Sequence, residues 1–144
     1  MEEQLNSKKK LKVYLAVPIV NYYNSEVTLL LGRIISEMGF EISSPWVLSG
    51  KDAGKTPEDI FYRDISSVKE SDILVAEISS PSHGVGMEIM QAYISNRKII
   101  MVAREGSNIS FLVRGVPGST LVEYKNYEDL EENLKKFLER EMML

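Results

Sequence analysis

Carboxylates and hydroxyls are the groups in this chain that could catalyse a reaction, because thiols and imidazoles are scarce. The 144 residues include no Cys and a single His, His83. A thiolate nucleophile, a disulfide framework and a Cys-based metal site are therefore excluded, as is a site with several His ligands. A Ser-His-Asp triad would have to use His83, and no nearby motif supplies its partners. Carboxylate chemistry is the class that remains.

The segment Ser82–Glu88, with the sequence Ser-His-Gly-Val-Gly-Met-Glu, is the most informative one. It follows the most apolar run and opens a predicted helix, whose free backbone N–H groups favour an anion such as phosphate. Gly84 and Gly86 permit a ligand to approach the backbone closely. We expect Glu88 near the first helical turn, where the helix dipole would keep it ionised and available as a nucleophile. The same pattern also fits an acid that only complements the helix dipole.

Asp64 and Tyr14 are further candidates, and their sequence neighbours leave the roles open. Asp64 lies in a predicted helix, 24 residues before Glu88. Spacing alone favours a solvent-facing acid paired with Arg63 or Lys69. Tyr14 lies in the middle of a predicted strand, where an aromatic residue is more often part of the core.

The elements that would position these residues alternate between strands and helices. Short β-branched or apolar runs predict strands at 12–17, 40–43, 73–78, 98–103 and 120–124. Amphipathic spacing predicts helices at about 25–38, 57–71, 85–96 and after 126. This order predicts a single doubly wound, mainly parallel five-stranded sheet of the flavodoxin or Rossmann type, an α/β fold with helices on both faces. Ligands of such sheets bind beyond the carboxyl ends of the strands, here at 17–24, 43–56, 79–85 and 104–114.

Length, charge and hydropathy limit the domain organisation, the partners and the location of the protein. A flexible polar tail is predicted at 1–10, followed by one α/β catalytic domain at 11–144. The net charge of −4 argues against a nucleic-acid partner. No apolar run approaches the roughly 18 residues of a membrane span, so no membrane partner is expected. The polar start lacks the apolar core of a signal peptide, which, with the lack of Cys, predicts a cytoplasmic protein.

Taken together, these residues resemble the nucleoside 2-deoxyribosyltransferase superfamily, and within it the branch of 2'-deoxynucleoside 5'-monophosphate N-glycosidases. The similarity covers the chain from Lys12 to about Phe137. It rests on Tyr14, Asp64, Ser71-Asp-Ile-Leu-Val-Ala-Glu77, the segment Ser82–Glu88, and Val113-Arg114-Gly115.

The resemblance implies a role for each of the three candidates. Glu88 would attack the anomeric carbon and form a glycosyl-enzyme intermediate, Asp64 would protonate the leaving base, and Tyr14 would orient the nucleophile. This agrees with retaining glycoside cleavage, in which one carboxylate is the nucleophile and another group handles protons. The resemblance implies no metal and no organic cofactor.

The resemblance also implies how the substrate is held. Serines at the positions of Ser82 and Ser110 would contact the 5'-phosphate, the latter from the neighbouring subunit of a homodimer. Gly84 and Gly86 would line the same phosphate site. Transferases acting on unphosphorylated nucleosides usually carry an acid where Ser82 stands, and an acid would repel phosphate.

Apolar groups such as Ile19 and Trp46 would line the base pocket. One segment departs from the hydrolase pattern: the first loop of the hydrolases carries a Gly-Ser-Ile-Arg element, where this chain has Val17-Pro18-Ile19-Val20. The resemblance implies hydrolysis of 2'-deoxynucleoside 5'-monophosphates to free base and deoxyribose 5-phosphate. Two alternatives stay open: a deoxyribosyltransferase that exchanges bases between deoxynucleosides, and a nucleotide-binding protein without turnover.

Overall fold

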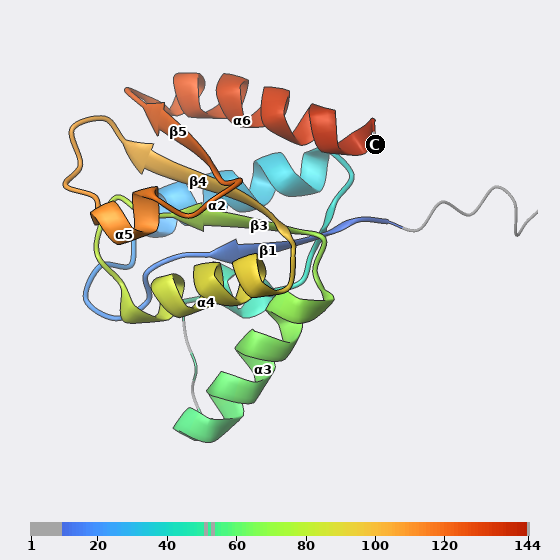
Figure 1. Ribbon diagram of the computed structural model, residues 1–144, viewed down its shortest axis with the longest axis vertical. Helices are drawn as coiled ribbons and strands as arrows, with labels where there is room; N and C mark the ends of the chain where they lie inside the picture. Colours follow the sequence, from blue (N-terminus) through green and yellow to red (C-terminus); the bar gives the residue numbers. More distant parts are fainter. Residues whose placement is uncertain (1–9, 51, 53, 144) are drawn as a thin grey trace, which may run out of the picture.

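Five strands and their connecting helices make up the computed structural model, which describes residues 10–50, 52 and 54–143 (Figure 1). Apart from Lys10, the predicted N-terminal tail lies outside the described residues. The strands are β1 (Lys12–Ala16), β2 (Glu41–Ile42), β3 (Ile73–Glu77), β4 (Lys98–Arg104) and β5 (Thr120–Tyr124). The helices are α2 (Ser25–Glu37), the 3-10 helix η1 (Pro45–Leu48), α3 (Pro57–Glu70), α4 (His83–Ile94), α5 (Phe111–Arg114) and α6 (Tyr127–Met142).

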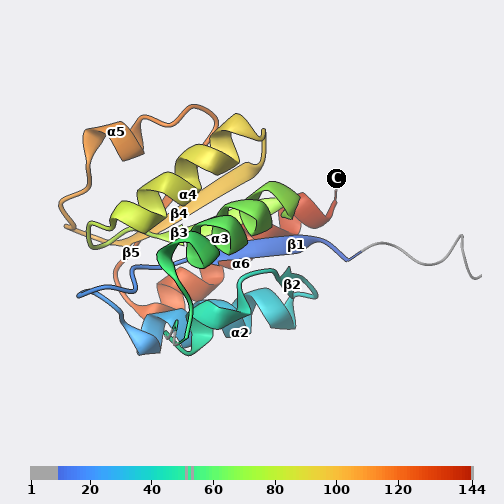
Figure 2. The same cartoon turned by 90° about the horizontal axis from the view of Figure 1, so that it is seen from below.

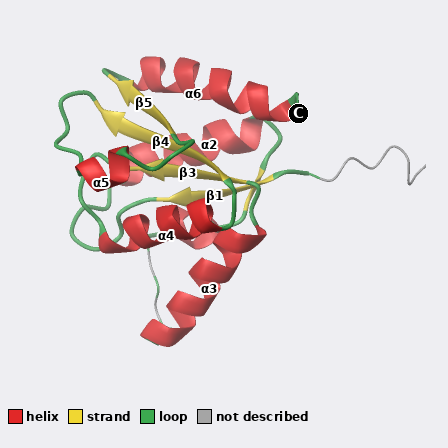
Figure 3. Ribbon diagram, in the orientation of Figure 1, coloured by secondary structure: helices red, strands yellow, loops and turns green. Residues whose placement is uncertain are grey.

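The strands form one sheet in the order β2-β1-β3-β4-β5, and every neighbouring pair is parallel. The labelled strand arrows therefore point the same way in Figure 3. Helices α2 and α6 cover one face of the sheet, and α3, α4 and α5 cover the other (Figure 2). The predicted doubly wound α/β fold is confirmed. In the described part of the chain, no helix is long and apolar enough to cross a membrane.

Alternation along the strands divides the buried side chains between the two faces. In β1, Val13 and Leu15 pack in the core beneath α2 and α6, whereas Tyr14 and Ala16 pack with α3 and α4. Tyr14 is fully buried, as its mid-strand position predicts. The same alternation directs its phenol group toward the helices that carry Asp64 and Glu88.

Helix boundaries follow local capping groups, and the start of α4 and two short helices differ from the sequence-based expectation. Helix α4 begins at His83 rather than Val85, because the Ser82 side chain caps it by accepting a hydrogen bond from the Val85 N–H at 3.2 Å. Helices η1 and α5 were not predicted, since four residues each give no readable periodicity. The start of α3 agrees with expectation: Thr56 and Asp59 exchange the two hydrogen bonds of a capping box.

Candidate active site

A cavity of about 610 Å³ opens at the carboxyl edge of the sheet, between the loop after β1, η1, and the facing parts of α3 and α4. Its position agrees with the expected ligand-binding edge of a parallel sheet. Of the predicted site residues, six lie on its wall: Ile19, Trp46, Asp64, Ser82, Gly84 and Glu88.

Glu88 projects from the second turn of α4 and is 8% exposed. Its Oε2 accepts a hydrogen bond from the Tyr14 hydroxyl. Burial raises the pKa of Glu88 to about 8, although the bond from Tyr14 acts to lower it. The expectation that the helix dipole keeps this carboxylate ionised is therefore wrong. Because α4 begins earlier than expected, Glu88 lies beyond the first turn, and loss of solvation outweighs the dipole.

Tyr14 stays a hydrogen-bond donor over the whole accessible pH range. Burial, reinforced by the nearby Glu88 carboxylate, raises the pKa of this phenol far above its ordinary value. The hydroxyl therefore holds one oxygen of Glu88 in place and does not compete with it as a base.

Asp64 reaches the same cavity from α3, which packs against α4. It is paired with Arg63, whose Nε donates to Asp64 Oδ1 at 2.7 Å. The pairing is one that the sequence allowed, but the acid is about one-fifth exposed rather than solvent-facing. Burial raises the pKa of Asp64, and Arg63 opposes that shift. Two acids whose environments disfavour the ionised form thus face one cavity, an arrangement suited to acid–base and nucleophilic chemistry.

Trp46 and Ile19 form the apolar part of the wall. The Trp46 ring stands edge-on to Tyr14, with 6.2 Å between ring centroids and 66° between planes. An indole and an aliphatic side chain offer a surface on which a flat heterocycle could pack.

Comparison with known proteins gives this cavity a family context. No protein-family model matches the chain. A protein of Thermofilum pendens, provisionally named 2'-deoxynucleoside 5'-phosphate N-hydrolase 1, is 34% identical over 137 residues, which cover 89% of this chain and 95% of the relative. This chain belongs to the 2'-deoxynucleoside 5'-phosphate N-hydrolase family.

Two solved structures share the fold. A CMP N-glycosidase of Clostridium botulinum superposes with a TM-score of 0.66 at 24% identity, covering 85% of this chain and 97% of that one. A 2-deoxyribosyltransferase of Bacillus psychrosaccharolyticus gives 0.62 at 17% identity, covering 83% and 90%. At these identities, the likeness shows that this member of the N-hydrolase family shares its fold with both proteins.

The phosphate ligands expected of the N-hydrolase family are divided between two cavities. Ser82 lines the Glu88 cavity and also a smaller one of about 70 Å³, which it shares with Gly86 and Ser110. A Cβ on Gly86 would meet nothing within 4 Å, and one on Gly84 would meet only Ser82 Oγ, at 4.0 Å. The start of α4 is therefore open to a ligand. Ser110 of the described chain does not line the cavity that contains Glu88.

The loop that departs from the hydrolase pattern also lies on the wall, through Val17, Ile19 and Val20. Sequence reasoning missed two charged residues beside it. Arg63 was considered only as a partner for Asp64, and Asp52 was not singled out, yet both line the Glu88 cavity. Arg63 is the one Lys or Arg among the described residues on that wall. The position of Arg63 directly before a candidate acid was the available signal.

No cluster of three or more potential metal ligands occurs in the described ranges.

Proposed function

We propose that this protein is an enzyme that hydrolyses the N-glycosidic bond of 2'-deoxynucleoside 5'-monophosphates, releasing free base and deoxyribose 5-phosphate. The observation that carries the proposal is the buried Tyr14–Glu88 pair facing Asp64 across one cavity, in a chain of the N-hydrolase family. The cavity, at about 610 Å³, is large enough for a nucleotide-sized ligand.

The first half of the reaction forms a glycosyl ester. Glu88 attacks C1' of the deoxyribose with the carboxylate oxygen that Tyr14 leaves free. The C1'–N bond breaks, its electron pair goes to the base, and the base takes a proton from Asp64. The raised pKa of Asp64 favours the protonated form that this step needs.

The second half releases the sugar. Asp64, now ionised, takes a proton from water while the water oxygen attacks C1'. The ester C1'–O bond breaks and the Glu88 carboxylate is regenerated. Because the pKa of Glu88 is raised to about 8, the nucleophile becomes more available as the pH rises toward that value.

The phosphate would lie at the start of α4, against Ser82, Gly84 and Gly86. A second copy of the chain would complete the site with Ser110. Support for a homodimer comes from an apolar surface on the α3, α4 and α5 side, next to Ser110. Its side chains, each more than half exposed, are Tyr62, Met87, Met90, Ile94, Phe111 and Leu112. Exposed apolar side chains on one side of a molecule suit an interface between copies.

One chromatographic experiment separates the three candidate functions. The protein is incubated with deoxynucleosides and with their 5'-monophosphates, with and without free adenine. Base release from the monophosphate alone supports hydrolysis. New deoxyadenosine that forms only when adenine is added would instead support transfer. Thermal stabilisation by the nucleotides without any base release would instead support a nucleotide-binding protein without turnover.

A matched pair of variants ties the result to the site. Glu88→Ala should abolish base release, whereas Glu139→Ala, on the exposed surface of α6, should not change it. Mass spectrometry of rapidly quenched reactions tests the covalent step. With a substrate whose base leaves without protonation, Asp64→Asn should accumulate protein carrying the deoxyribose phosphate, because the base that activates water is missing. Analytical ultracentrifugation tests the dimer, with Leu112→Glu expected to give monomers.

A further inference from the structure

Arg63 contacts three side chains at once and is largely buried, unlike a surface ion-pair partner. Its Nε donates to Asp64 Oδ1 at 2.7 Å, and its Cζ lies 4.0 Å from the centre of the Trp46 ring. Its Nη2 also forms an ion pair with Asp52 Oδ1, at 2.8 Å. Both atoms are buried, and among the described residues neither has a partner with hydrogen-bond geometry. The Arg63 side chain is 18% exposed.

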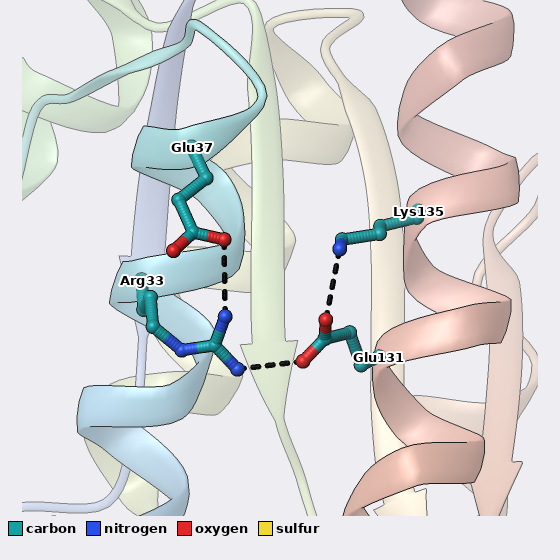
Figure 4. Close-up of polar contacts among 4 residues, drawn as sticks. All are labelled: Arg33, Glu37, Glu131 and Lys135. Atoms are coloured by element: carbon teal, nitrogen blue, oxygen red, sulfur yellow. Dashed lines mark hydrogen bonds and ion pairs between the residues drawn. The ribbon is translucent and has the colours of Figure 1, made fainter.

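A contrasting arginine shows what an ordinary ion-pair network looks like in the same molecule. Arg33 on α2 also contacts two acids, Glu37 at 3.0 Å and Glu131 of α6 at 2.6 Å (Figure 4). Its side chain is 46% exposed and it lies on the opposite face of the sheet from the cavity. Networks of this kind contribute little to stability in water. Arg33 therefore serves as a matched control for Arg63.

Three acids lie with Arg63 on the cavity wall. Asp64 lies on the same helix, Asp52 lies in the preceding loop, and Glu88 faces from α4. Tyr14 contributes a neutral hydroxyl from β1, and His83 lies on the cavity wall at the start of α4. Arg63 thus places a single guanidinium among three carboxyl groups. Without it, Asp64 and Glu88 would be harder to ionise, because Arg63 lowers the pKa of both carboxyl groups.

We propose that Arg63 is a positioning residue for the reaction. It fixes the proton donor Asp64 through one carboxylate oxygen, and by stacking on Trp46 it holds that acid at a set place beside the base pocket. The other oxygen of Asp64 then stays free to meet the leaving base. A guanidinium does both tasks at once, because it donates in its plane and stacks through its face. Lysine would keep the charge but lose both the planar fork and the stacking. The proposal rests on the proposed function, since it assigns Arg63 a part in that reaction.

The test compares Arg63→Gln, Arg63→Lys and the control Arg33→Gln by kcat, KM, the pH profile of base release, and Tm. Arg63→Gln should lower kcat by about 10- to 100-fold, the usual effect of a misplaced catalytic group, and change KM much less. Its whole pH profile should move to higher pH, because the cation no longer assists the ionisation of Asp64 and Glu88. Arg63→Lys should keep the wild-type profile with a reduced kcat. Arg33→Gln should match the wild type in kcat and in the pH profile.

Two outcomes would overturn the proposal. One is an Arg63→Gln variant whose kcat stays within about twofold of the wild type. The other is a fall in kcat that accompanies a lower Tm with an unmoved pH profile, which is the signature of a merely structural role. An NMR titration of the Asp64 carboxyl group in the wild type and Arg63→Gln gives a readout without turnover. The titration midpoint should rise in the variant, and an unchanged midpoint contradicts the proposal. A wild type that releases no base, together with a raised midpoint, would defeat the proposed function alone.

Discussion

Two buried glutamates, each hydrogen-bonded to a tyrosine, lie on opposite faces of the same sheet. Glu88 of α4 is bonded to Tyr14, and Glu77, the last residue of β3, accepts a bond from the Tyr124 hydroxyl at 2.8 Å. Their exposed fractions are similar, 8% and 5%. By composition and burial alone, the two pairs are alike.

The difference lies in what the remaining carboxylate oxygen contacts. In Glu77, Oε1 accepts a hydrogen bond from the Ser79 N–H at 2.5 Å, so both oxygens have donors from the chain itself. In Glu88, the described residues supply a donor for Oε2 only. Glu88 also shares its cavity with a second acid, whereas Glu77 lines a separate cavity of about 310 Å³ that contains Arg104. A buried Glu–Tyr pair becomes a candidate nucleophile only when one oxygen is left for a substrate.

The largest expected contrast is in activity. Glu88→Ala should lower base release by about 10³- to 10⁶-fold, as removal of a nucleophile does in other enzymes. Glu77→Gln should keep kcat within a few-fold of the wild type while lowering the free energy of unfolding by about 1–3 kcal/mol, because a buried donor loses its partner. Initial rates and chemical denaturation measure the two effects. Comparable activity losses in both variants would contradict the assignment of Glu88, and not Glu77, as the nucleophile.

The second acid distinguishes the two pairs further. Asp64→Asn should reduce kcat by about 10²- to 10⁴-fold, the range typical of a lost general acid. The loss should be smallest for substrates whose leaving base needs little protonation. Rates on a series of 5'-monophosphates with bases of different acidity measure this. Equal losses across the series would argue that Asp64 does not protonate the base.

The two tyrosines should also behave differently. Tyr14→Phe should lower kcat/KM by about 10- to 100-fold, the value of a lost hydrogen bond to a charged group. It should also move the limb that reports Glu88 ionisation to higher pH, because the Tyr14 bond lowers the pKa of Glu88. Tyr124→Phe should change stability alone. A pH–rate profile of each variant tests this, and an unmoved limb in Tyr14→Phe contradicts the assignment.

The last contrast concerns stability against pH rather than activity. The pKa of Glu88 is raised to about 8 from an ordinary 4.5, so the folded state holds a proton that the unfolded state loses. The stability of the wild type should therefore decline between pH 4.5 and about 8, by this linkage. Glu88→Gln removes that decline and should be the more stable protein at pH 8, by a few degrees in Tm for each ~1 kcal/mol. Calorimetry across this pH range measures the difference. Parallel stability curves would show that Glu88 ionises normally.

Local signals account for most of the fold that could be read from the sequence. Apolar runs marked the five strands, Thr56 marked the start of α3, and Asn24 caps α2 by accepting from the Glu26 and Val27 N–H groups. Each signal is carried by neighbours within a few residues. The missed elements, η1 and α5, are four residues each and too short for such a signal. The start of α4 was misplaced by two residues, because the helix begins directly after its cap Ser82 and before the apolar pattern.

The candidate site was predictable as a set of residues, and its geometry was not. By itself, the sequence determined the alternating elements, the scarcity of catalytic groups other than carboxylates, and the pairing of Glu88 with Asp64 as acids of interest. Only the tertiary structure decided that Tyr14 bonds Glu88, since 74 residues separate them along the chain. It also decided that burial outweighs the helix dipole at Glu88 and that Arg63 stacks on Trp46. Desolvation and stacking depend on which distant segments pack together, and no local pattern encodes them.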